Sequence, residues 1–137
     1  MNKNIAVIGA SGAIGNAFVE HYSNDQSVNT VYAFSRNKQS YENKKIQSYE
    51  LEIENQNSIQ DAAEKIKENR LNHIIVATGI LHSESFGPEK SIKDINHDSM
   101  TKVMSVNTIG PSLIGRYFIP LLTKDTKSVL AFLSARV

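Results

Sequence analysis

A glycine-rich turn near the start of the chain carries the groups best suited to bind an anion. The turn Gly9-Ala10-Ser11-Gly12-Ala13-Ile14-Gly15 follows a short apolar run and precedes residues with helical spacing. A glycine directly after a strand lets the chain turn sharply, and small residues let backbone N–H groups reach a phosphate at the start of a helix. This sequence of strand, turn and helix predicts a site for the pyrophosphate of a dinucleotide.

A second polar pair lies about 20 residues beyond the turn, where Ser35 and Arg36 follow another apolar run. In dinucleotide-binding folds a carboxylate at this distance binds the ribose hydroxyls of NAD, whereas a basic residue accommodates the extra phosphate of NADP. Arg36 can offer a charge-assisted fork to that 2′-phosphate, and Ser35 can offer a hydroxyl. The pair therefore favours NADP over NAD. The alternative is that Arg36 is a solvated residue at the end of a strand.

These residues need a scaffold, and the pattern of apolar residues predicts one. Short apolar runs predict strands over residues 4–8, 30–34, 45–51, 73–77 and 127–133. Helical spacing follows the turn and recurs over residues 58–69, where Asn57 or Ser58 is placed to cap the helix. The third helix is long, over residues 98–122, and Pro111 should bend it. Met100, Val103 and Met104 are interpreted as part of its core face.

Alternating apolar strands and helices predict an α/β fold: a Rossmann-type doubly wound parallel sheet with helices on both faces. The 137 residues have room for one domain, residues 1–137, with its ligand at the carboxyl ends of the strands. The fifth strand should be central in a complete fold of this kind, so the domain is expected to be incomplete at its C-terminus. We therefore expect either self-association or a chain that is a piece of a longer protein.

Composition narrows the possible partners. The formal net charge is +1 and the basic residues form no block, so the composition does not indicate binding to nucleic acid or to an anionic membrane. No apolar run approaches the ~20 residues of a membrane span. The chain has no cysteine, and its four histidines lack metal-ligand spacing, so we predict no metal site. These features are compatible with a protein of the cytoplasm.

Three segments together resemble the short-chain dehydrogenase/reductase family. Gly9-x-x-x-Ala13-x-Gly15 is similar to its cofactor turn, with alanine at the usual middle glycine. Ala77-Thr78-Gly79 is similar to its Asn-Ala-Gly stretch, and Val106-Asn107-Thr108-Ile109-Gly110 to the asparagine-bearing bend of its long helix. Four segments look closest to the C-factor branch: Gly12-Ala13-Ile14-Gly15, Thr78-Gly79-Ile80-Leu81-His82, Pro88-Glu89-Lys90-Ser91 and Leu133-Ser134-Ala135-Arg136-Val137.

The resemblance implies an NADP-dependent oxidoreductase that transfers hydride to a carbonyl or from an alcohol of a small molecule. It implies that the Asn107 side chain holds a water of a proton relay; the alternative is a hydrogen bond at the bend of the helix, and both can be true. It also implies that the long helix forms the subunit contact of a homo-oligomer. It places Ser134 where the family has its substrate-orienting serine, although that role can also fall to a residue beyond Val137. It makes Glu52-Ile53 a bracket for adenine; the alternative for this pair is a strand end at the surface.

A tyrosine–lysine pair, four residues apart on a helix after the fifth strand, is the acid/base group of the family, and this chain ends before that helix. The spacing occurs once, from Tyr41 to Lys45, but between the second and third strands, where we interpret it as a surface loop. The chain alone is therefore predicted to be inactive. The alternative function is that of a non-catalytic dinucleotide-binding protein with a signalling or redox-sensing role.

Overall fold

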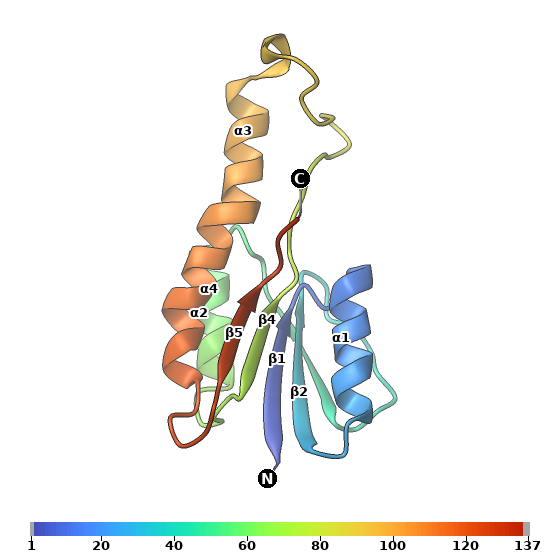
Figure 1. Cartoon of the computed structure of the whole chain (residues 1–137), viewed down its shortest axis with the longest axis vertical. Coiled ribbons are helices and arrows are strands. Elements are labelled where there is room, and N and C mark those ends of the chain that lie inside the picture. The colour runs from blue at the N-terminus through green and yellow to red at the C-terminus, as the bar shows by residue number, and fades with distance from the viewer. Residues whose placement is uncertain (1, 136–137) are drawn as a thin grey trace.

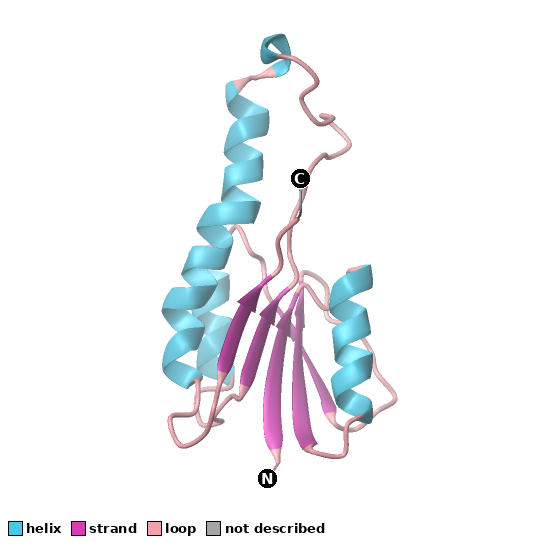
Figure 2. Ribbon diagram, viewed as in Figure 1, coloured by secondary structure: helices cyan, strands magenta, loops and turns pink. Residues whose placement is uncertain are grey.

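The computed structural model describes residues 2–135, in which five strands form one parallel sheet (Figures 1 and 2). The strands are β1 (Lys3–Ile8), β2 (Val28–Ser35), β3 (Ile46–Glu50), β4 (His73–Val76) and β5 (Val129–Phe132). Their spatial order is β3-β2-β1-β4-β5, and every neighbouring pair is parallel. The order reverses at β1, and a sheet of this kind has its binding crevice outside the carboxyl ends of the strands at that reversal. The predicted fold class is confirmed.

Helices cover both faces of the sheet (Figure 2). On one face lies α1 (Ala13–Asn24), and on the other lie α2 (Gln56–Lys65) and α4 (Gly110–Phe118). The central strand β1 is buried on both sides: Ile5 and Val7 pack toward α1, whereas Ala6 and Ile8 pack in the opposite core. A strand covered on both faces can be apolar throughout, which explains its uninterrupted apolar run.

The long helix is continuous from residue 97 to residue 121 but changes its winding on the way. It starts as α3 (His97–Met104), loosens into the π-helical segment η2 (Ser105–Ile109), continues as α4 and tightens into η3 (Ile119–Leu121). The loosened segment immediately precedes Pro111, whose missing N–H and ring interrupt the regular hydrogen bonding of the previous turn. The predicted irregularity at Pro111 is thus a π-helical segment.

Two expectations about the helices are wrong. Met100 and Met104 are 48% and 49% exposed, because α3 extends beyond the carboxyl edge of the sheet and has no strands beneath it (Figure 1). The cap of α2 is Asn55, whose side chain accepts from the Ser58 N–H at 3.1 Å. The helix begins earlier than its apolar spacing suggested, so Asn57 and Ser58 both lie inside it.

The strand β5 lies at an edge of the described sheet and is less covered than the strands inside it. Val129 and Phe132 are exposed, as is Leu133 just beyond the strand, while Leu130 packs against the core beneath α4. Another short 3-10 segment, η1 (Ile92–Asp94), is found in the connection that leads out to α3.

Candidate dinucleotide site

The turn after β1 is built around a glycine in a conformation that other residues rarely adopt. Gly9 has φ = +86°, in the region that favours glycine. Its N–H and the N–H of Ala10 both donate to the carbonyl of Phe34 at 2.9 Å, which fastens the turn to the end of β2. The chain therefore reverses sharply beside the crevice, as the sequence indicated.

Gly15 is required for a different reason, a close approach between α1 and the turn. A Cβ built on Gly15 would lie 2.0 Å from the carbonyl oxygen of Gly9, far inside van der Waals contact. A Cβ on Gly12 would lie 3.5 Å from the same oxygen, an ordinary contact. The helix thus stands directly on the turn only because position 15 has no side chain.

The resulting N-terminus of α1 is open to an anion. Gly12 is its cap and contributes no side-chain hydrogen bond, and Ser11, Ala13 and Ile14 are exposed. The first N–H groups of a helix have no partner within it, and the helix dipole adds positive potential at this end. The geometry therefore fits a pyrophosphate.

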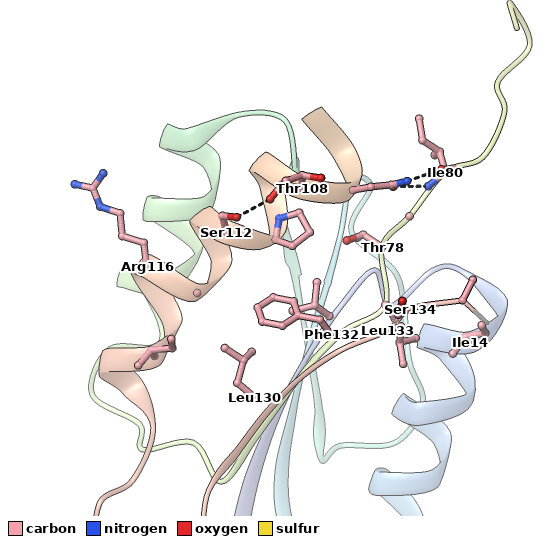
Figure 3. A pocket seen from close by; sticks show the side chains of 18 of the residues that line it. Ile14, Thr78, Ile80, Thr108, Ser112, Arg116, Leu130, Phe132, Leu133 and Ser134 are labelled. Atoms are coloured by element: carbon pink, nitrogen blue, oxygen red, sulfur yellow. Dashed lines mark hydrogen bonds between the residues drawn. The ribbon is translucent and has the colours of Figure 1, made fainter. Parts of the chain in front are cut away.

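A hollow of about 1230 Å³ opens beside this helix end, between the segment after β4, the long helix and the end of β5 (Figure 3). Ile14, 60% exposed, lines one side, and Leu130 and Phe132 line another. The side-chain oxygen of Thr78 is buried at this hollow without a hydrogen-bond partner among residues 2–135. An unpaired buried hydroxyl costs about 1–3 kcal/mol, so this position is destabilised unless a partner reaches the hydroxyl.

Three predicted residues line this hollow together, namely Ala77, Thr78 and Gly79, in the segment that leaves β4. This segment packs closely against Gly9: a Cβ on Gly9 would lie 3.0 Å from both the Ala77 carbonyl carbon and the Thr78 methyl group. The segment after β4 and the turn after β1 therefore form neighbouring walls of one crevice, although about 70 residues separate them in the chain.

Asn107 joins the same hollow from the π-helical segment. Its Oδ1 accepts from the Ile80 N–H at 2.8 Å, and its Nδ2 donates to the Ile80 carbonyl at 2.7 Å (Figure 3). The side chain thus holds the backbone that follows β4, and the water contact implied by the resemblance stays a prediction. The carbonyl of Asn107 receives no helical hydrogen bond from Pro111, since proline has no N–H.

The residues predicted for the adenine end lie at the ends of β2 and β3. Ser35 is buried and its hydroxyl donates to the Asn37 carbonyl at 2.8 Å, whereas Arg36 is exposed. The Ile53 side chain is also buried, in the core beneath Gly110, where a Cβ would approach it to 2.4 Å. Glu52 is half-buried and accepts from the Glu54 N–H at 3.3 Å. Ile53 as a whole residue is 6% exposed, so Glu52 is the more accessible member of the pair.

Ser134 follows β5, is exposed and lines the hollow. The Leu133–Val137 segment ends with Arg136 and Val137, which lie outside the described residues. Tyr41 is not in the lining: it packs against the core beneath α1, and its hydroxyl is buried without a partner in the described part of the chain. Lys45 donates through Nζ to the Asp25 carbonyl at 2.9 Å.

Sequence reasoning missed the far wall of the hollow. Leu130, Phe132, Gly115 and Ile119 form it, and the sequence shows them only as core-like apolar positions. Gly115 gave no clear signal either, because a Cβ there would meet Ile119 and Phe132 at 3.8 and 4.0 Å, which are ordinary contacts. Over residues 2–135 we find no group of three His, Asp or Glu side chains that could hold a metal ion. No helix in that range is long and apolar enough to cross a membrane.

Comparison with known families identifies the class to which this fold and site belong. The family model described as short chain dehydrogenase matches residues 3–136, so the chain belongs to the short-chain dehydrogenase family. No curated protein matches the sequence. The C-factor branch is not distinguished by these matches and stays a prediction.

Solved structures share the fold. A short chain dehydrogenase family protein from Francisella tularensis is 23% identical with a TM-score of 0.80, over 96% of this chain and 50% of that one. An NADPH-bound carbonyl reductase from chicken fatty liver is 25% identical with a TM-score of 0.73, over 88% and 48%. The putative carbonyl reductase Sniffer of Caenorhabditis elegans is 19% identical with a TM-score of 0.80, over 98% and 64%. The chain spans between about half and two thirds of these structures.

Proposed function

We propose that this chain binds NADP(H) and serves an oxidoreductase that reduces carbonyls or oxidises alcohols of small molecules. The observation that carries the proposal is the contact of Gly15 with Gly9, which sets the bare N-terminus of α1 at the reversal of the strand order. The carbonyl reductases among the structural neighbours, one of them NADPH-bound, favour this function over a non-catalytic signalling role.

The residues of this chain would contact the cofactor at two ends of the crevice. The amides at the start of α1 would hold the pyrophosphate, together with the exposed Ser11. Glu52 and the backbone of Ile53 would border adenine, and Arg36 would meet the 2′-phosphate. Ile14 and the Ala77–Gly79 segment would face the nicotinamide, which supplies or accepts the hydride when the cofactor is bound.

Two residues are proposed to act near the substrate. The Asn107 side chain fixes the backbone at Ile80, so the wall of the hollow keeps its position while ligands exchange. The Asn107 carbonyl, free of a donor from Pro111, would hold a water for proton transfer. Ser134, exposed at the rim, would orient the substrate oxygen by a hydrogen bond.

Titration calorimetry with NADPH and NADH tests the cofactor assignment. We expect Arg36→Gln to weaken NADPH about tenfold to hundredfold, the equivalent of one charge-assisted hydrogen bond of about 1.5–3 kcal/mol, and to leave NADH unchanged. Lys127→Gln is the control, since Lys127 is exposed and lies before β5, at the opposite edge of the sheet. Absence of binding for both nucleotides, or equal losses for both in Arg36→Gln, would refute the proposal.

The proposal extends to self-association through the long helix. Its exposed apolar residues Met100, Met104 and Ile109 have no counterpart in the described chain that covers them. Exposed apolar patches on soluble domains mark interaction sites. Sedimentation velocity at micromolar concentration should show a dimer or a larger assembly, and Met104→Glu should dissociate it; a wild-type monomer would contradict this part of the proposal.

A further inference from the structure

The segment that links β3 to α2 contacts the long helix along its length. The contacts are an ion pair of Lys102 with Glu54, close packing of Gly110 on Ile53, and a hydrogen bond of Tyr117 with Gln56. The side-chain amide of Gln56 donates to the Tyr117 hydroxyl at 2.9 Å, and a Cβ on Gly110 would lie 2.7 Å from the Ile53 carbonyl oxygen. The long helix thus lies against the segment that includes the Glu52-Ile53 pair predicted to border adenine.

A regular α-helix would not direct Lys102 and Gly110 to the same side. An α-helix turns about 100° per residue, so the eight residues from Lys102 to Gly110 would leave these two about 80° apart around the axis. The π-helical segment lies between them, and the Gly110 N–H donates to the Ser105 carbonyl, five residues back. A turn of this kind takes up one extra residue, which reduces the angle to about 20°. The irregular winding therefore directs Lys102 toward Glu54.

Lys102 also connects α3 to the body of the fold. The helix α3 extends beyond the carboxyl edge of the sheet (Figure 1). Within residues 2–135, the side chains of α3 form one hydrogen bond to a residue outside the long helix and its cap Asn96, and it is the bond from Lys102 to Glu54. The Glu54 side chain is 27% exposed and that of Lys102 is 47% exposed, so the pair is partly shielded from water.

Glu54 in turn belongs to a short stretch of backbone that is held by hydrogen bonds. Its N–H donates to the Glu52 carboxylate at 3.3 Å, and the Glu52 N–H donates to the Ser58 hydroxyl in α2 at 2.9 Å. The Asn55 N–H donates to the Glu52 carbonyl at 3.1 Å. Because these bonds connect Glu54 to Glu52, a displacement of Glu54 also displaces the more accessible member of the predicted adenine pair.

We propose that Lys102 is a positioning residue for the adenine end of the cofactor site, acting through Glu54 on the Glu52-Ile53 pair; this rests on the proposed binding of NADP(H). The effect is reciprocal, since a coupling between two places in a protein acts equally in both directions. A nucleotide that orders the segment after β3 also orders α3. The same long helix holds Ile80 through Asn107, so one element positions both ends of the crevice.

Calorimetry and hydrogen exchange with adenosine 5′-diphosphate, which carries both adenine and a pyrophosphate, test this role without catalysis. We expect Lys102→Met to weaken the nucleotide about twofold to fivefold, the range for one partly exposed ion pair. In the wild type, saturating nucleotide should slow amide exchange over residues 97–104 by a similar factor, and Lys102→Met should lose this slowing. The exchange of charges in Lys102→Glu with Glu54→Lys should restore both properties.

Lys93→Met is the matched control. Lys93 is exposed in η1, in the connection that leads to α3, and it forms no ion pair with any residue in the range 2–135. Its replacement removes the same charge from the same part of the molecule. We therefore expect Lys93→Met to change neither the affinity for the nucleotide nor the slowing of exchange in α3.

The outcomes separate this inference from the proposed function. If the wild type binds the nucleotide and Lys102→Met keeps both the affinity and the slowed exchange, the inference fails while the proposed function stands. Equal losses in Lys102→Met and Lys93→Met would reduce the effect to overall charge, and a charge exchange that restores nothing would reduce it to stability; either result overturns the inference. If the wild type does not bind the nucleotide, the proposed function fails and takes the inference with it.

Discussion

Replacing Gly15 by alanine tests the packing on which the whole site depends. The new Cβ would lie 2.0 Å from the Gly9 carbonyl oxygen and 2.7 Å from its carbon, whereas ordinary contact begins at 3.4 Å. Both partners are backbone, so no side chain can rotate away, and α1 or the turn has to move by about 1.4 Å, the difference between 3.4 and 2.0 Å. The substitution therefore strains the protein at its binding site.

The expected size of the effect follows from two opposing terms. Overpacking of a tight contact costs typically about 1–3 kcal/mol. The better helix propensity of alanine returns at most about 1 kcal/mol. Because both contacting atoms are backbone, the upper end of the overpacking cost applies, and we expect Gly15→Ala to lower the free energy of unfolding by about 2 kcal/mol. We also expect it to weaken NADPH about tenfold to hundredfold, because the amides at the start of α1 are displaced from the pyrophosphate.

Gly12→Ala provides a matched control in the same turn. Its Cβ would lie 3.5 Å from the same carbonyl oxygen, and its φ of −74° suits any residue. The loss should stay within about 1 kcal/mol, the cost of alanine at a helix cap. Urea unfolding followed by circular dichroism and calorimetry with NADPH measure the two quantities. If Gly15→Ala were as stable as Gly12→Ala and bound NADPH as tightly as the wild type, the packing argument would be wrong.

Three further substitutions test other parts of the structure. Asn107→Ala should leave the fold intact but speed hydrogen exchange of the Ile80 amide at least tenfold, because a hydrogen bond of about 1.5 kcal/mol is lost. Unchanged protection of this amide would show that the Asn107 side chain does not hold it. Tyr41→Phe should preserve NADPH affinity and keep or raise the free energy of unfolding, because it removes a buried hydroxyl without a described partner; a loss above ~1 kcal/mol would show that the hydroxyl is bonded. Burial lowers the pKa of His73 below 6.5, so the unfolded chain binds more protons below that pH. Stability should therefore fall as pH drops through 6.5 toward the lowered value, and His73→Gln should flatten this slope in urea titrations; an unchanged slope would contradict the assignment.

The sequence was a good guide to features that depend on neighbours in the chain. Gly9 follows an apolar run and precedes a helix, and those two facts are sufficient to predict the turn. The alternation of strands and helices predicted the parallel sheet, since right-handed crossovers leave few other arrangements. The cap of α2 was missed even at this level, because Asn55, Asn57 and Ser58 are all good caps and their spacing does not choose between them.

Features that depend on distant partners could not be predicted in this way. Periodicity marked Met100 and Met104 as one apolar face, but it does not tell whether a sheet lies opposite, and here the helix has passed the sheet edge. The Glu52-Ile53 pair looked like a ligand contact, yet Ile53 is buried where Gly110 approaches it from 57 positions away. Asn107 has a side chain that suits many tasks, and only the fold brings Ile80 within its reach.

By itself the sequence determined the fold class, the glycine turn after β1 and the place of a basic residue at the end of β2, because each is a local pattern with its own physical requirement. Only the tertiary structure distinguished the glycines of that turn. Gly9 adopts a positive φ, and Gly15 leaves no room for a Cβ beside the Gly9 carbonyl. A Cβ on Gly12 would make only an ordinary contact. Such distinctions depend on distances across the chain, which residue types and spacing do not contain.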